Sequence, residues 1–356
     1  MRQINYKNKQ EGGFLIELMI GMLMSTLTVL GIVTIYSQFE IQKRTTVQVG
    51  STMSNASLAM YPLQHRAKMA GYGIANKSML GCTVKAYNAN GNRDFDFTLT
   101  PVLITPGAGD LDSDKISFTY GNSIVSMLPV KLTAASNSDN ANIKVENKAG
   151  FNPGDLVILS EANKTCNLVQ VSGIQASSDV LLRNTGDYIN PITGKKEDIT
   201  YNKTGGLEGA ESYSDNAVAL NIGAAPETVQ YSVVNNQLIE INNLDLSTKT
   251  VADNVMLLKT RYGLDKDKNG IIEEWTTNIG ATSNYEFLKA IKIAMVVRAP
   301  LIEQKKNGEC KVTTNGVFNW DDSFIDITDI TPDWACYRYR FVQSIVPLRN
   351  MMWSLQ

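Results

Sequence analysis

The sequence predicts an α+β protein in which one long N-terminal helix precedes a β-rich head. Residues 14–36 are almost wholly apolar, and such a run is long enough to cross a bilayer core of roughly 30 Å as a helix. After Gly73 the composition changes to Ser, Thr, Asn, Gly and β-branched residues in short alternating segments. This second pattern is typical of strands joined by turns.

Composition, charge and the absence of catalytic motifs limit the classes of function that this protein can have. The chain has 356 residues, of which 43% are hydrophobic and 19% charged, so it is long enough for one or two folded domains plus an anchor. Its formal net charge is -2 and its basic residues form no block, so we expect no direct binding to nucleic acid. The single histidine, His65, falls on the expected helix, and no motif of a known catalytic class is present. We therefore predict no catalytic residues and no enzyme activity.

The chain divides into four expected parts. Residues 1–12 are polar and basic and are expected to be a leader on the cytoplasmic side, because basic flanks stay there. Residues 13–36 are the expected transmembrane helix, residues 37–73 its continuation, and residues 74–356 a head on the opposite side of the membrane. A secretory signal fits less well, because its apolar core has only about 7–15 residues and ends in small residues.

A single acidic residue interrupts the apolar run. Glu17 lies near its start, although a carboxylate in a membrane helix costs about 2.5–3.5 kcal/mol on insertion scales and usually marks function. The alternative is that this side chain reaches back to the membrane surface.

The residues around Glu17 resemble the type IV prepilin signature. Gly12 and Gly13 are followed by Phe-Leu-Ile-Glu-Leu-Met-Ile at residues 14–20. In that family a basic leader ends in Gly, and Glu stands at the fifth position of the mature apolar helix. The resemblance implies cleavage by a prepilin peptidase, methylation of the new N-terminus, and pairing of Glu17 with the N-terminal amine of a neighbouring subunit. Such pairing would neutralise two opposite charges inside an apolar bundle.

The signature differs from the usual family pattern in one place. Family members have Gly-Phe-Thr-Leu-Ile-Glu, whereas here one residue is missing between Phe14 and Leu15. Counting back from Glu17 places the cut between Gly12 and Gly13, and counting from Phe14 places it after Gly13. We favour the first, because the spacing between amine and Glu17 is the physical constraint, and the second stays open.

Segments farther along the chain resemble the PilW family of minor pilins. They follow the family's order along nearly the whole chain and lie at residues 71–73, 151–155, 261–265, 290–298 and 346–350. The resemblance implies a type IV pilin-like fold and a minor subunit that helps prime pilus assembly at or near the tip. Twitching motility, adhesion or DNA uptake would depend on such a pilus.

The same resemblance implies a set of partners and locations. The partners are other minor pilins, the major pilin, the prepilin peptidase, the inner-membrane assembly platform and membrane lipid. The protein would span the inner membrane once, with its head in the periplasm, and then enter the pilus fibre at the cell surface. Two alternatives stay open, namely a pseudopilin of type II secretion that is similar to GspJ, and a membrane-tethered adhesin.

The sequence also indicates individual elements. The helix is expected to continue to about Met69, with Pro62 kinking or interrupting it and Gly71 to Gly73 ending it. Strands are expected at residues 115–120, 142–146, 156–159, 167–171, 180–182, 228–234 and 237–241. The last two flank Asn235 and Asn236, a hairpin turn signal. Residues 184–225 are polar and rich in turn formers, so we expect a long loop region there.

Four cysteines are spread along the chain without a CxxC pair. In an exported domain they favour disulfides over a metal or redox motif. Four cysteines allow three pairings. We favour Cys310 with Cys336, because they flank one polar loop near the end of the chain, and by elimination Cys82 with Cys166.

An acidic segment resembles the front of a calcium loop. Oxygen-bearing side chains alternate at Asp265, Asp267 and Asn269, and Gly270 permits a sharp turn. An EF-hand needs Glu at the twelfth position, where this chain has Thr276. The candidate ligands are therefore Asp265, Asp267, Asn269, Ile271, Glu273 and Glu274. The alternative is a polar β-turn, for which the same residues are suited.

Overall fold

The computed structural model describes residues 13–74, 76, 78–123, 128–137, 142–303, 309–310, 312–320 and 323–353. The expected leader at residues 1–12, including Gly12, lies outside these ranges. The chain divides into two compact units, Met1–Ser51 and Thr52–Gln356.

Helix α1 (Gly13–Met69) is one uninterrupted helix of 57 residues. Pro62 lies inside it, so the expected interruption does not occur. The proline removes the hydrogen bond to the carbonyl of Leu58, and Leu58 is 60% exposed, so water can take the place of the missing donor. The helix ends at Met69, as expected. Gly71 and Gly73 follow with φ of 83° and 71°, a left-handed conformation that glycine adopts without strain.

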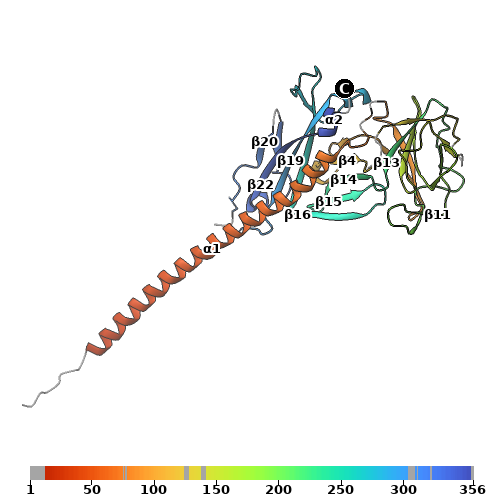
Figure 1. Ribbon diagram of the computed structural model, residues 1–356. Coiled ribbons are helices and arrows are strands. Elements are labelled where there is room, and N and C mark those ends of the chain that lie inside the picture. The colour runs from red at the N-terminus through yellow and green to blue at the C-terminus, as the bar shows by residue number, and fades with distance from the viewer. Residues whose placement is uncertain are drawn as a thin grey trace, which may run out of the picture. The chain divides into compact units, whose positions relative to one another are not determined.

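The last turns of α1 belong to the core of the head. Buried side chains recur at helical spacing on one face of these turns and at the residue after them, and they are Ala56, Ala59, Met60, Leu63, Ala67 and Ala70. They share one hydrophobic cluster with strands of the second and third of the three larger sheets described below (Figure 1). The compact unit therefore begins inside the helix, at Thr52, whereas the sequence places the start of the head at residue 74. A fragment that begins at residue 74 lacks these core side chains, so an autonomous fragment must begin near Thr52.

Three larger sheets form the head within the described residues. The first has the order β2 (Arg93–Thr98), β1 (Thr83–Asn88), β8 (Cys166–Gln170), β7 (Leu156–Ser160), β13 (Val218–Gly223) and β5 (Val130–Lys131). The second has the order β16 (Thr248–Asp253), β15 (Gln237–Asn242), β14 (Glu227–Val234), β4 (Lys115–Tyr120) and β3 (Val102–Thr105). The third has the order β18 (Glu274–Thr276), β17 (Val255–Leu264), β19 (Leu288–Arg298) and β22 (Tyr339–Pro347).

Smaller elements complete the head. A three-stranded sheet contains β6 (Ile143–Lys144), β10 (Val180–Leu182) and β9 (Gly173–Ile174). Two hairpins are formed by β11 (Asp187–Ile189) with β12 (Lys196–Asp198) and by β20 (Val317–Trp320) with β21 (Ser323–Asp326). The short helices are η1 (Asp110–Asp112), η2 (Thr282–Phe287), η3 (Trp334–Cys336) and α2 (Arg349–Trp353).

Strand alternation explains how the core is built. In β4 the side chains of Ile116 and Phe118 are fully buried in the cluster that receives α1, while Ser117 faces the other side of the sheet, as expected for a period of two. The hairpin of β14 and β15 turns at Asn235 and Asn236, whose φ values are 52° and 61°. Positive φ at both positions is typical of a type I′ turn, and this expected hairpin is confirmed.

The expected loop at residues 184–225 is wrong in part. It contains β11, β12 and β13, and β13 lies between β7 and β5 in the first sheet. Its residues Ala-Leu-Asn-Ile are buried, so the strand lacks the alternation by which a half-exposed strand is recognised. The buried Asn221 is accommodated because its Nδ2 donates a hydrogen bond of 2.7 Å to the Asp155 carboxylate.

Candidate functional site

The first candidate site is the apolar part of α1. Among the described residues α1 is the one helix that is long and apolar enough to cross a membrane, and its most apolar stretch is not buried. Its hydroxyls are satisfied within the helix, because Thr28 and Thr34 donate to the carbonyls of Met24 and Leu30 at 2.7 and 2.6 Å. A segment without access to water requires such hydrogen bonds within the helix, because no water can accept from these hydroxyls.

Glu17 is isolated in this apolar segment. It is the only charged residue between positions 13 and 36, and it lies one helical turn after Gly13, exposed on the helix surface. Phe14 is 74% exposed. Because Gly12 lies outside the described residues, the cleavage position stays a prediction. The arrangement presents one carboxylate and many apolar side chains, which suits association with other apolar helices rather than chemistry on a substrate.

The second site is a charged cluster that sequence reasoning missed. Arg66 lies on α1, and its Nη1 is 2.7 Å from Glu227 Oε2 while its Nη2 is 3.3 Å from Glu240 Oε1. Arg66 also donates a hydrogen bond to the Tyr120 hydroxyl, and the Tyr231 hydroxyl donates to Glu240. Burial raises the pKa of Tyr231, and its hydrogen bond to Glu240 raises that pKa further. The cluster thus fixes the end of α1 to β4, β14 and β15.

Polar contacts from the C-terminal part of the chain hold the same end of the helix. Asn350 Nδ2 lies 3.3, 3.1 and 3.2 Å from the carbonyl oxygens of Lys68, Met69 and Ala70. The last carbonyl groups of a helix have no backbone N–H partner within the helix, so they need a donor from elsewhere. Gln64 Nε2 donates to Ser344 Oγ on β22 at 2.9 Å. The helix end is therefore capped by residues almost 300 positions later in the sequence.

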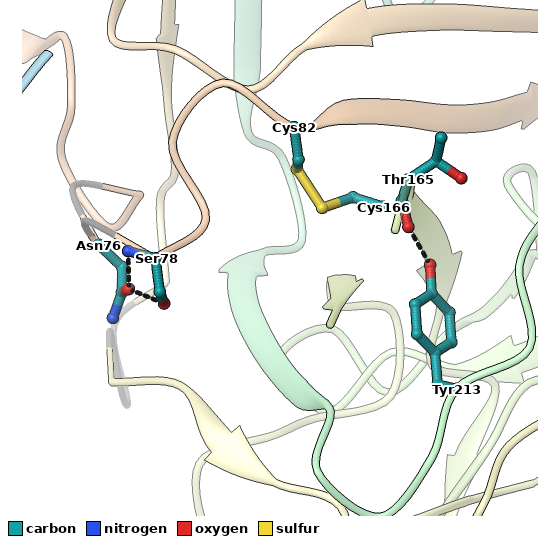
Figure 2. The surroundings of a disulfide bond; sticks show 6 residues. All are labelled: Asn76, Ser78, Cys82, Thr165, Cys166 and Tyr213. Carbon is teal, nitrogen blue, oxygen red and sulfur yellow. Dashed lines mark hydrogen bonds between the residues drawn. A yellow bond between two sulfur atoms is a disulfide. The ribbon is translucent and has the colours of Figure 1, made fainter. Parts of the chain in front are cut away.

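Both expected disulfides are present. Cys82 is bonded to Cys166 and Cys310 to Cys336, with Cα–Cα distances of 6.0 and 4.7 Å. Figure 2 shows the first pair, with the Tyr213 hydroxyl directed at the carbonyl of Thr165, next to Cys166; that hydrogen bond is 2.9 Å long. The first disulfide joins residues 84 positions apart, so it closes a long loop and restricts the unfolded chain.

The acidic segment after β17 gathers part of the expected ligand set. Carboxylate oxygens of Asp265, Asp267 and Glu273 lie within 4.8 Å of one another, so this group can hold a metal ion. Asp265 is buried, and its two oxygens accept hydrogen bonds of 3.0 Å from the backbone of Asn269 and Gly270. The loop is thus folded around the Asp265 carboxylate.

Of the other expected ligands, Glu274 is not part of this group, whereas Asn269 lies next to it and donates from Nδ2 to Asp267 Oδ2 at 2.9 Å. Glu274 forms an ion pair of 2.5 Å with Lys266, while the Lys266 backbone donates to Glu273 Oε2 at 2.9 Å. Asn269 uses its Oδ1 to accept the backbone N–H of Ile271 at 2.7 Å. These hydrogen bonds are the ones expected of a polar turn. A cation could bind to this loop where the carboxylates of Asp265, Asp267 and Glu273 converge.

The fold and the family match together indicate the class of protein to which this chain is similar. One long helix, apolar in its first part and packed by its last turns into a β-rich head, agrees with the type IV pilin-like fold that the sequence predicted. Residues 222–350 match the family described as PilW, Type IV Pilus-assembly protein W. The resemblance to the PilW family is thereby confirmed, over a region that contains Glu227, Glu240 and the acidic loop. Searches of curated proteins and of solved structures found no significant match.

Proposed function

We propose that the chain is a minor pilin that is made as a prepilin and helps prime type IV pilus assembly at or near the tip. The observation that carries the proposal is the combination of the PilW match with an apolar segment at residues 13–36 whose only charge is Glu17. The described side chains offer association surfaces, and we infer a structural rather than a catalytic role.

The proposed assembly step follows from charge and solvent. In the inner membrane Glu17 is surrounded by lipid, where a lone carboxylate is unfavourable. The N-terminal amine of a neighbouring subunit, exposed by the prepilin peptidase, would neutralise it when both helices leave the membrane through the assembly platform. The partners are the other minor pilins and the major pilin. The head would lie in the periplasm before assembly and at the cell surface afterwards.

The match to a pilus-assembly family favours the pilus over the type II secretion pseudopilin. Deletion of the gene is expected to reduce surface pili at least about tenfold and to abolish twitching, with secretion of type II substrates unchanged. Pili are counted by shearing and by electron microscopy, and the wild-type gene on a plasmid is the control. Normal pili together with a secretion defect would contradict the proposal and favour the pseudopilin.

We also infer that Asp265, Asp267 and Glu273 bind Ca²⁺, because three converging carboxylates suit a hard cation with oxygen ligands. Calorimetry on the full chain in detergent is expected to show a dissociation constant on the order of 10⁻⁴–10⁻³ M, as in extracellular modules. Asp267→Ala should abolish the heat. The control is Asp245→Ala, at another exposed aspartate whose Oδ1 accepts a backbone N–H two residues on. No heat from the wild type up to millimolar calcium would exclude the site.

A further inference from the structure

A cavity of about 310 Å³ lies beside the hairpin of β11 and β12. Its lining comes from the turn at residues 151–155, from that hairpin, from the segment after β4 and from the end of β13. This size is sufficient for a side chain or a small ligand. Most of the lining residues precede residue 222, so the cavity lies largely outside the region that matches the PilW family.

The cavity contains a buried carboxylate without a cation. Asp155 lines it and is only 7% exposed. Its Oδ2 accepts hydrogen bonds from the Asn152 backbone at 2.8 Å and from Asn221 Nδ2 at 2.7 Å. Within the described residues no hydrogen bond or ion pair reaches Oδ1 of Asp155, and burial raises the pKa of this carboxyl. Because a buried carboxylate is costly when unpaired, a cation that contacts Oδ1 would be favourable here.

An aromatic ring is fixed next to this carboxylate. Tyr188 lines the cavity, and its ring lies so close to Gly154 that a Cβ there would be 2.5 Å from a ring carbon. Its hydroxyl donates to Glu197 at 2.7 Å. Burial, that hydrogen bond and the charges of Glu197 and Asp155 raise the pKa of Tyr188 to about 12. A neutral ring beside a carboxylate attracts a cation.

The remaining walls are suited to an aliphatic chain. Pro153, Pro191, Ile192 and Ala224 line the cavity, and they can cover the methylene stem of a long side chain whose charged end reaches the carboxylate. Ile192 at the rim is 83% exposed, and Ile189 on the same hairpin is 59% exposed. Exposed apolar side chains around a polar anchor are typical of a protein interface.

We propose that this cavity binds a lysine side chain presented by a partner protein, with its ammonium group on Asp155 Oδ1. Lysine is favoured over arginine because only one carboxylate oxygen is free, whereas a guanidinium binds best to both oxygens at once. Asn152 also lines the cavity and offers an amide oxygen for a second ammonium donor. The proposal does not depend on the role of Glu17 or on incorporation into pili.

The test is saturation-transfer NMR on the full chain in detergent. The probe is Nα-acetyl-lysine methylamide, which is compared with the arginine and norleucine analogues and with methyl glucoside. We expect the lysine probe to bind at least about tenfold more tightly than each of the others. Asp155→Asn should weaken its binding at least about tenfold, whereas Asp96→Asn, at an exposed carboxylate paired with Lys85, should leave it unchanged.

A second variant separates cavity binding from folding. Ala224 lines the cavity and is exposed, so Ala224→Trp should fill the space without disturbing the core and should abolish lysine binding. Absence of lysine binding in the wild type would overturn the proposal. So would equal binding of the norleucine analogue, unchanged binding in Ala224→Trp, or tighter binding of methyl glucoside, which would indicate a carbohydrate site.

Discussion

Arg66→Ala is expected to destabilise the fragment 52–356 by about 3 kcal/mol, because it leaves the carboxylates of Glu227 and Glu240 without their shared cation. Glu240 is 11% exposed at its side chain and Glu227 is 35% exposed, so the loss should fall at the lower end of the range for buried pairs. The Tyr120 hydroxyl would also lose the hydrogen bond that Arg66 donates to it. Urea unfolding of the purified fragment, produced in an oxidising compartment, measures the difference.

The control for this prediction is a surface pair. Lys85 and Asp96 are 2.7 Å apart, and the Asp96 side chain is 49% exposed, so Lys85→Ala should cost less than about 1 kcal/mol. Arg66→Lys keeps the charge but loses the forked geometry, and its stability should fall between wild type and Arg66→Ala. Equal stability of wild type and Arg66→Ala would show that the cluster does not hold the helix to the head.

Glu17→Ala is expected to leave the protein in the membrane and to reduce its amount in sheared pili at least about tenfold. Removing the carboxylate makes membrane insertion more favourable, so loss from pili cannot come from loss of the anchor. A tenfold change corresponds to about 1.4 kcal/mol, well within the range of a charge pair out of water. Quantitative immunoblots of membrane and pilus fractions give the ratio.

A matched control lies on the same helix. Glu40→Ala also removes an exposed carboxylate from α1, but at a position beyond the apolar segment, and incorporation should stay at the wild-type level. Glu17→Gln keeps the size and polarity of the side chain and should be defective as well, because the charge is what pairs with the amine. Normal incorporation of Glu17→Ala would refute the proposed role of this residue.

Patterns that are local in the sequence predicted the fold well. The apolar run gave the helix, Gly71 and Gly73 marked its end, and Asn235 with Asn236 gave the hairpin, because each depends on neighbouring residues. The pairing of Cys310 with Cys336 followed in the same way from a single loop. The acidic segment was recognised, but the separation of Glu274 from the group was not, because it depends on the ion pair with Lys266.

Features that depend on distant residues were missed. Arg66 has no sequence signal, since its partners Glu227 and Glu240 are more than 150 positions away and meet it only when α1 packs on β14 and β15. The strand β13 was read as loop because burial on both faces removes alternation. Asp155 stood out in the sequence only as part of the segment 151–155 that resembles the PilW family, whereas its burial in a cavity requires β13 and the hairpin of β11 and β12.

The most direct test of the central claim is the intact mass and N-terminal sequence of the protein from cells with and without prepilin peptidase. A pilin should lose residues 1–12 and gain one methyl group, only when the peptidase is present, with Gly13 as its first residue. Loss of residues 1–13 would keep the pilin class and make Phe14 the first residue. An uncleaved chain in both strains would contradict the account and leave a single-span membrane protein.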